Sequence, residues 1–385
     1  MLGIINGKIM TMADETIENG KILIEDGKIK AIGKDIELPK DCEIYDAKGA
    51  LVTPGLVDAH CHLGMFGDSV GFEGSDGNEV TDPVTPQMRA IDGINPFDGY
   101  FKDAYMGGVT SAMTGPGSAN TIGGTFAVIK TYGNRIDNMI VKFPAAMKIA
   151  FGENPKRVYG SNGKMPYTRM AVAATIREEL MKAKEYLAKK ENAKEEKDMP
   201  PFDMKHEAFI PVLKKEIPLK AHAHRADDIF TSIRIAKEFD LDLTLDHCTD
   251  GHLVADELAK EGFPAIVGPT FGDRPKVELK NKTFDTPRVL YEAGMKIAIN
   301  TDSPVIPLEN LPLCAAFAIN AGLPEDIAWK SITINAAEIS GVGDRVGSLE
   351  IGKDADIVIW DKNPLRTVDY KVLATIIDGK IVYRA

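Results

Sequence analysis

Short apolar segments alternate with longer helical segments between residues 51 and 345, and this alternation restricts the fold more than any other feature of the chain. Such a pattern is typical of parallel strands covered by helices. The predicted helices are 168–190, 226–239, 253–262, 286–293 and 324–339. The predicted strands are 56–59, 109–113, 139–141, 146–150, 219–221, 241–245, 265–267 and 296–299. Eight strands in a segment of this length predict a (β/α)8 TIM barrel of the α/β class.

Both chain ends differ from this central part, because they are rich in short strands without intervening helices. Asn-Gly and Asp-Gly pairs, which favour hairpin turns, occur at 6–7, 26–27 and 378–379. We therefore expect residues 1–50 and 346–385 to form one small composite domain, a β-sandwich, beside a barrel domain of residues 51–345.

The charge of the chain limits its partners. Lys and Arg number 46 against 57 Asp and Glu, so the net charge of −11 repels nucleic acids and anionic membranes. No segment has the run of about 18 apolar residues that spans a membrane, and the basic region of a signal peptide is missing. The four cysteines form no C-x-x-C pair, which favours a reducing compartment. We expect a cytoplasmic homo-oligomer that acts on a small-molecule substrate and binds neither nucleic acid nor membrane.

Histidines gather where the predicted strands end. His60 and His62 follow the first strand, and residues two apart on a strand point to the same face. The remaining candidates follow the fifth, sixth and eighth strands: His222, His224, His247 and Asp302. The carboxyl ends of barrel strands meet at one mouth, where catalytic groups collect. Imidazole and carboxylate donors suit Zn²⁺, with Mn or Fe as alternatives, so we expect one or two divalent ions there.

Two assignments at this mouth remain open from the residues alone. We assign His222 to the metal, because it comes first at the strand end, and give His224 a substrate-binding role. Lys148 lies inside an apolar strand, where an uncompensated charge is costly. Carboxylation by CO2 would let Lys148 bridge two ions, whereas the alternative is a lysine that reaches the rim or pairs with an acid. Glu153 is then the rival carboxylate ligand.

Substrate-binding residues are expected in the loops that follow the strands. Arginine binds a carboxylate through two parallel hydrogen bonds, and several arginines and one tyrosine lie in such loops. We select Arg89, Arg157 and Tyr159 for this role, with Arg225 and Arg274 as further cations. The glycine-rich segments 115–117 and 122–124 are interpreted as loops, and they lack both a Walker lysine and the Rossmann spacing. A nucleotide site is therefore not expected.

The motifs resemble one known superfamily. Residues 51–62 (LVTPGLVDAHCH) look like the first-strand signature of the amidohydrolase superfamily, and residues 346–358 (VGSLEIGKDADIV) resemble its return to the small β domain. The resemblance covers nearly the whole chain and includes His247 and Asp302. It implies a metal-dependent barrel that hydrolyses C–N bonds, nearest to the imidazolonepropionase-related branch with its prolidase-like dipeptidases.

The fifth strand departs from imidazolonepropionase itself. That enzyme and similar deaminases place an acidic residue soon after the strand-five histidine, whereas this chain reads His222-Ala-His224-Arg225. This segment and Lys148 resemble instead the dipeptidase and carboxypeptidase members that have a two-metal centre.

Together these observations predict a metal-dependent amidohydrolase in which a metal-activated water attacks an amide carbonyl. Asp302 would pass the proton to the leaving nitrogen, and His247 would support the metal or the developing oxyanion. The expected substrate is a dipeptide, an N-acyl amino acid or a cyclic amide. The alternatives are an imidazolonepropionase-like cyclic amidase or heterocycle deaminase, and a non-catalytic barrel scaffold.

Overall fold

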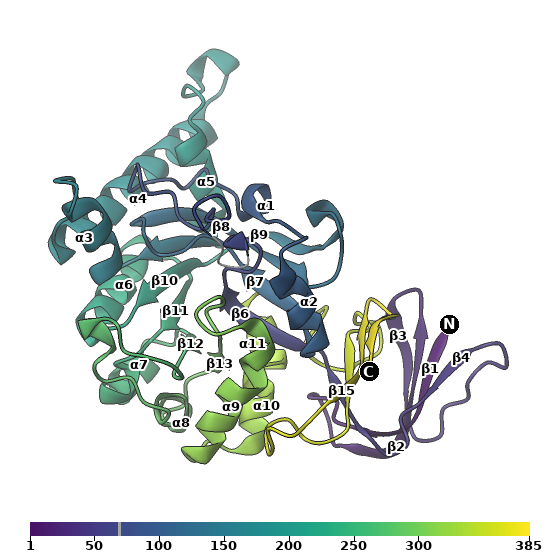
Figure 1. The fold of residues 1–385 in the computed structure, drawn as a ribbon. Coiled ribbons are helices and arrows are strands. Elements are labelled where there is room, and N and C mark those ends of the chain that lie inside the picture. Colours follow the sequence, from purple (N-terminus) through teal and green to yellow (C-terminus); the bar gives the residue numbers. More distant parts are fainter. Residues whose placement is uncertain (68–70) are drawn as a thin grey trace.

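The computed structural model describes residues 1–67 and 71–385, which form a barrel with a separate sheet beside it (Figure 1). The barrel sheet has eight strands, each next to its neighbours in the sequence. These strands are β6 (Leu56–Cys61), β7 (Val109–Thr114), β8 (Ile122–Lys130), β9 (Ile140–Ala150), β10 (Leu219–Ala223), β11 (Leu243–His247), β12 (Ala265–Val267) and β13 (Ile297–Ile299). The first and last strands approach each other, because the Asp302 amide donates to the His60 carbonyl at 3.3 Å. The predicted barrel fold is confirmed.

One strand of this barrel runs against the others. β8 pairs antiparallel with both β7 and β9, whereas the remaining pairs are parallel. The prediction of strands was wrong here in two respects. The segment 122–124, interpreted as a loop, begins β8, and the strands predicted at 139–141 and 146–150 are one strand, β9.

The residues explain both errors. Glycine weakens strand patterns, but at Gly124, where φ is +117°, a Cβ atom would lie 2.5 Å from the Met88 carbonyl oxygen. Pro144 interrupts the apolar pattern of β9, and proline within a sheet is found at bulges. The pairing of β8 with β9 shifts register beside it, between Phe126 and Val128.

Helices surround the barrel on its outer side (Figure 1). They are α1 (Ala90–Gly93), α2 (Gly99–Met106), α3 (Glu153–Gly160), α4 (Arg169–Asn192), α5 (Met204–Leu213), α6 (Ala226–Phe239), α7 (Ala255–Ala259), α8 (Thr286–Glu292), α9 (Leu311–Asn320), α10 (Glu325–Ser331) and α11 (Ile334–Ile339). The helix predicted over 226–239 matches α6 at both ends, whereas the one predicted over 324–339 is divided into α10 and α11. No helix within the described residues is both long and apolar enough to cross a bilayer.

The second sheet is built from both ends of the chain, and Figure 1 shows the purple and yellow strands side by side. Its order is β16-β15-β14-β5-β1-β2-β3, and β4 pairs with β1. The strands are β1 (Leu2–Ile9), β2 (Ile17–Glu25), β3 (Lys28–Gly33), β4 (Glu43–Asp46), β5 (Leu51–Pro54), β14 (Ile357–Trp360), β15 (Val372–Ile377) and β16 (Lys380–Arg384). The turns expected at 26–27 and 378–379 are present, but Asn6 and Gly7 lie inside β1 at a register shift.

Two apolar layers fix the position of the functional residues. Side chains such as Leu56, Val109 and Leu219 point from the strands towards the helices and form the larger core. The opposite faces of the same strands fill the barrel interior, where Val57, Phe126 and others are fully buried. Residues at the carboxyl ends of the strands therefore stand on a closely packed base.

Candidate metal centre

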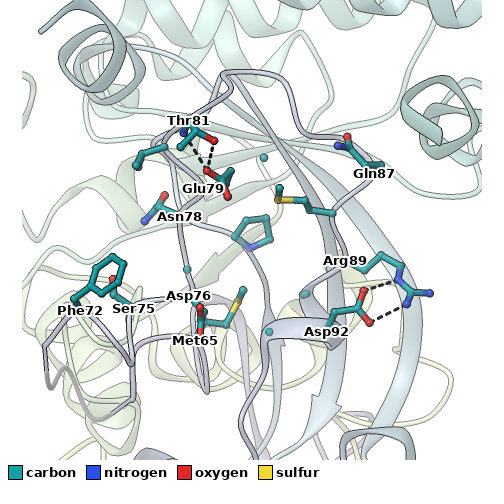
Figure 2. Close-up of a pocket in the computed structure, with 17 residues that line it drawn as sticks. Met65, Phe72, Ser75, Asp76, Asn78, Glu79, Thr81, Gln87, Arg89 and Asp92 are labelled. Carbon is teal, nitrogen blue, oxygen red and sulfur yellow. Dashed lines mark hydrogen bonds and ion pairs between the residues drawn. The ribbon is translucent and has the colours of Figure 1, made fainter. Parts of the chain in front are cut away.

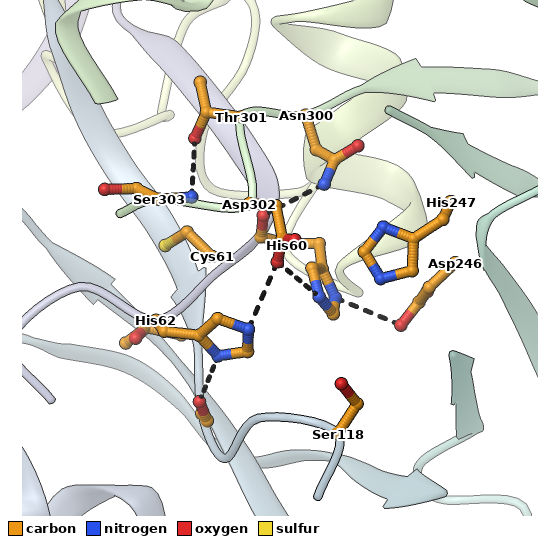
Figure 3. A network of polar contacts seen from close by, with 12 residues as sticks. His60, Cys61, His62, Ser118, Asp246, His247, Asn300, Thr301, Asp302 and Ser303 are labelled. Atoms are coloured by element: carbon orange, nitrogen blue, oxygen red, sulfur yellow. Dashed lines mark hydrogen bonds and ion pairs between the residues drawn. The ribbon is translucent and has the colours of Figure 1, made fainter. Parts of the chain in front are cut away.

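The first donor group joins the two ends of the barrel sheet. His60 and His62 stand at the end of β6, and Asp302 follows β13 (Figure 3). Asp302 Oδ1 lies 3.4 Å from His60 Nε2 and 3.2 Å from His62 Nε2. Cys61 points away, with its thiol towards the Met113 carbonyl, as strand alternation predicts. Three ligand atoms thus converge from distant parts of the chain.

Backbone contacts fix the tautomers of two histidines. His62 Nδ1 donates to the Gly115 carbonyl at 2.7 Å, and His247 Nδ1 donates to the Gly268 carbonyl at 2.7 Å. Because a carbonyl only accepts, Nδ1 carries a proton in both rings, and Nε2 is the nitrogen that could bind an ion. Burial lowers the pKa of His247 to about 3, so its ring is neutral, the form that binds a metal.

A second donor group lies beside the first. It consists of His222 and His224 from β10 and Glu278 from the 3₁₀ turn Val277–Leu279 after β12. The ring centroids of His222 and His247 are 4.5 Å apart, and those of His60 and His247 are 4.9 Å apart, so His247 connects the two groups. Burial, followed by the neighbouring imidazoles of His247 and His224, holds the pKa of His222 well below its usual value.

Glu278 was not anticipated from the sequence. Its Oε1 lies 3.8 Å from His224 Nε2, while its Oε2 accepts from the Glu153 backbone amide at 2.9 Å. Glu153, the rival carboxylate ligand, therefore contributes its amide here, and its own side chain is one-third exposed and faces Arg157. In the sequence, Glu278 is recognisable only as an acidic residue in the loop after the seventh strand. It lies too far beyond the strand end to belong to a strand-end motif.

Lys148 is fully buried on β9, next to Lys220 of β10. Its Nζ is 4.0 Å from Asp246 Oδ2 and has no hydrogen-bond partner among the described residues. Burial lowers its pKa to about 8, against the opposing effect of Asp246. An ammonium group without a close partner is costly in such a place, so the amine is poised for neutralisation or for covalent change.

Charged residues beneath the mouth orient the first group. Asp58 accepts from the His60 amide and from both the amide and the hydroxyl of Thr301, and burial raises its pKa to about 6. Lys220 Nζ donates to Asp246 Oδ1 at 3.2 Å and to the Ala59 carbonyl at 2.9 Å. These contacts tie β6 to β10, β11 and the segment after β13.

The predicted substrate-binding residues are dispersed. Arg89 pairs with Asp92 and lines a cavity of about 600 Å³, shown in Figure 2. Arg157 is exposed and 4.0 Å from Glu153. Tyr159 is fully buried, and its hydroxyl hydrogen-bonds with Asn120 and the Asp82 carbonyl. Of the four residues given this role, the structure places only His224 among the donor groups.

None of the donor residues lines the cavity of Figure 2. Gly123 forms part of its wall, and a Cβ atom at this glycine would lie 3.3 Å from Lys148 Cγ. Its volume lies within the range of sites that bind small molecules.

The donor set fits divalent cations. Imidazole nitrogens and carboxylate oxygens are ligands for Zn²⁺, Mn²⁺ or Fe²⁺. Several buried atoms of the two groups and of His247 have no hydrogen-bond partner within residues 1–67 and 71–385, as expected for atoms that coordinate an ion: His60 Nε2, His222 Nε2, His247 Nε2 and Glu278 Oε1.

A barrel whose strand ends present these donors defines a class of hydrolases that depend on divalent ions. The model of the amidohydrolase family matches residues 51–382, and the chain belongs to this family. The predicted superfamily membership is thereby confirmed, and the protein is a hydrolase that acts on C–N bonds.

Similar proteins agree with this assignment. An amidohydrolase from Thermotoga maritima MSB8 has a solved structure that is 44% identical, covers 100% of both chains and superposes with a TM-score of 0.96. The amidohydrolase tasK of Hapsidospora irregularis is 32% identical over 92% of this chain, which spans only 38% of that protein's length. The imidazolonepropionase of Maricaulis maris is 27% identical over 90% of this chain and 88% of its own.

Proposed function

We propose that the protein hydrolyses the amide bond of a dipeptide, an N-acyl amino acid or a cyclic amide. The reaction takes place in a centre that holds two divalent ions, and Zn²⁺ is the first candidate. The observation that carries this proposal is the pair of adjacent donor groups, His60–His62–Asp302 and His222–His224–Glu278, with His247 between them. Bound ions would polarise the amide carbonyl and make water more acidic.

Asp302 is the group proposed to move the proton. Although burial raises its pKa, the imidazoles of His247, His60 and His62 outweigh burial and hold the pKa well below its usual value. The carboxylate is therefore ionised and can accept a proton from the attacking water. It then delivers this proton to the leaving nitrogen, which departs as an amine when the C–N bond breaks.

Lys148 is the proposed bridge between the two ions. Its neutral amine would attack CO2, forming one N–C bond and releasing one proton, and the product carboxylate would offer an oxygen to each side. Support for this role comes from the complete burial of Lys148 and from the missing partner of its Nζ within the described part of the chain. His247 would bind an ion or support the oxyanion that develops on the carbonyl.

The cavity whose wall includes Arg89 and Gly123 supports a small-molecule substrate, since about 600 Å³ accommodates a dipeptide-sized ligand. The four cysteines are free and buried, which supports the proposed cytoplasmic location.

The test is a hydrolysis screen with protein reconstituted separately with Zn²⁺, Mn²⁺ and Fe²⁺. Dipeptides, N-acyl amino acids and cyclic amides are offered, and metal content is measured by mass spectrometry. We expect turnover of at least one class, and its loss in Asp302→Asn while metal remains bound. A chain that binds none of the three metals, or that cleaves none of the three substrate classes, contradicts the proposal.

A further inference from the structure

Lys276 is a cation of the mouth that sequence analysis did not select. It lies in the segment between β12 and α8, immediately before the turn that carries Glu278. Its side chain is 19% exposed, and its Nζ lies 3.9 Å from Glu278 Oε1, beyond hydrogen-bond distance. Glu278 Oε1 in turn lies 3.8 Å from His224 Nε2, so the ammonium group stands next to the second donor group.

The other cations of these loops already have close partners. Arg225 forms two hydrogen bonds with Asp227, and Arg274 donates to the Lys282 carbonyl. Arg157 is 63% exposed and thus remains hydrated. Lys276, by contrast, is largely removed from water, and among the residues described its Nζ has no acceptor within hydrogen-bond distance. A mostly buried ammonium group without a hydrogen-bond acceptor favours the binding of an anion.

Glu278 does not supply that anion, because its carboxylate is held in another direction. The Glu153 amide holds Oε2 at 2.9 Å, and Gly152 leaves room for this contact, since a Cβ atom there would lie 2.6 Å from Oε2. Oε1 has no hydrogen-bond partner in the described residues and belongs to the donor group with His222 and His224.

This arrangement determines the charge that a substrate meets. With a cation held by the second donor group, the negative charge of Glu278 is compensated there, and Lys276 has no counter-charge of its own. An additional negative group at this place is therefore favoured, since charge-assisted hydrogen bonds are about twice as strong as neutral ones.

We propose that Lys276 binds a carboxylate of the substrate that lies near the scissile amide, so that the protein selects amides bearing a free carboxylate over uncharged ones. This inference rests on the proposed function, which it narrows: the substrate is an N-acyl amino acid, a dipeptide, or a cyclic amide with a carboxylate. Lys276 takes the role that sequence analysis had given to Arg89, Arg157 and Tyr159.

The experiment compares each acid with its uncharged carboxamide. The probes are N-acetyl derivatives of alanine, leucine, phenylalanine and glutamate, together with 5-oxoproline, each paired with its amide. Binding to the Zn²⁺-loaded full chain is measured by titration calorimetry, and KM and kcat are measured for every probe that is cleaved. The variants are Lys276→Met, Lys276→Arg and Lys280→Met. Lys280→Met is the control, because it removes an exposed lysine from the same loop.

We expect the wild-type chain to bind at least one acid about tenfold or more tightly than its amide. Lys276→Met should reduce this preference to about twofold or less and raise KM without lowering kcat to the same degree. Lys276→Arg should retain part of the preference, and Lys280→Met all of it. Metal content and the thermal transition, measured for each variant, show whether the fold and the ions are intact.

Two results overturn the inference: a wild-type chain that prefers no acid of the set, or a folded, metal-loaded Lys276→Met chain that keeps the full preference. These outcomes are separate from those of the proposed function. A chain that discriminates acids through Lys276 but hydrolyses nothing contradicts the proposed function alone, whereas hydrolysis without discrimination contradicts the role of Lys276 alone.

Discussion

Asp246 Oδ2 lies 3.0 Å from His60 Nδ1, and both side chains are fully buried. Asp246 immediately precedes His247 on β11, and the two consecutive residues have different roles. His247 faces the donor groups, whereas Asp246 contacts His60 from below. A carboxylate at Nδ1 keeps the proton on that nitrogen and leaves Nε2 free for a ligand role. Lys220 stabilises the charge of Asp246 from the opposite side.

We expect Asp246→Asn to weaken metal binding by about 10-fold to 100-fold, because the carboxylate that orients His60 is lost. Competition with a chromophoric chelator measures this affinity directly. The matched control is Asp242→Asn, an exposed aspartate just before the same strand. Equal affinities of Asp246→Asn and the wild type would contradict the orienting role.

Gly152 permits the position of Glu278. Its φ is +82°, and a Cβ atom would lie 2.6 Å from Glu278 Oε2 and 3.1 Å from Asp228 Oδ2. Gly152→Ala therefore combines backbone strain of about 1–3 kcal/mol with displacement of Glu278. We expect it to lower the free energy of unfolding and to release an ion from the second donor group.

Gly163→Ala separates these two effects. Gly163 also has a positive φ, +67°, but a Cβ atom there would meet nothing within 4 Å. This variant should show the strain alone, with unchanged metal content. If both variants retained the same number of ions per chain, Gly152 would have no role in placing Glu278.

The fold could be predicted from the sequence where local patterns agreed with tertiary structure. α6 combines an amphipathic pattern with acidic residues in its first turn, and its ends were found without error. β8 could not be recognised, because its two glycines are explained only by tertiary contacts: a Cβ atom at Gly124 would meet Met88, and one at Gly123 would meet Lys148. The strand prediction was divided at Pro144 because the evidence for one continuous strand is also a tertiary contact. Only the pairing with the partner strand shows that the chain continues through a bulge.

The site could be predicted in part for a related reason. Histidines at strand ends are recognisable, because strand order alone brings them to one mouth. Glu278 and Lys276 lie in a loop whose path no periodic pattern describes, so their proximity to His224 appears only in the structure. Tyr159 was selected as a loop residue, but α3 turns it inward to bond with Asn120.

A Tyr159 variant tests whether this residue stabilises the fold or binds substrate. Tyr159→Phe removes a hydroxyl that hydrogen-bonds with the Asp82 carbonyl at 2.8 Å and with Asn120 in a fully buried place. Buried acceptors that lose their donor cost about 1–3 kcal/mol. We expect the free energy of urea unfolding to fall by this amount, while KM stays within about twofold of the wild type. A large rise in KM without loss of stability would instead restore its predicted role in substrate binding.

The last prediction concerns the contact between the barrel and the terminal sheet. Lys130 at the end of β8 is buried, and its Nζ lies 2.7 Å from Asp356, 2.9 Å from Asp354 and 3.2 Å from Asp378. Asp354 also pairs with Lys28 and Arg345. Although burial raises the pKa of Asp354, Lys130 and the other cations outweigh burial and hold the pKa below its usual value.

A depressed carboxylate pKa stabilises the fold above the pKa of the unfolded chain, about 3.9 for aspartate, and this contribution is lost as the pH falls through the lower folded value. We therefore expect Asp354→Asn to reduce the free energy of unfolding by about 3 kcal/mol near neutral pH. The deficit should shrink as the pH falls below about 4, where the wild-type carboxylate becomes protonated too. Urea unfolding across this pH range measures it, with the exposed Asp35→Asn as control. A deficit that stays constant with pH would mean that Asp354 acts through packing, because only the loss of an ionised group makes the difference depend on protons.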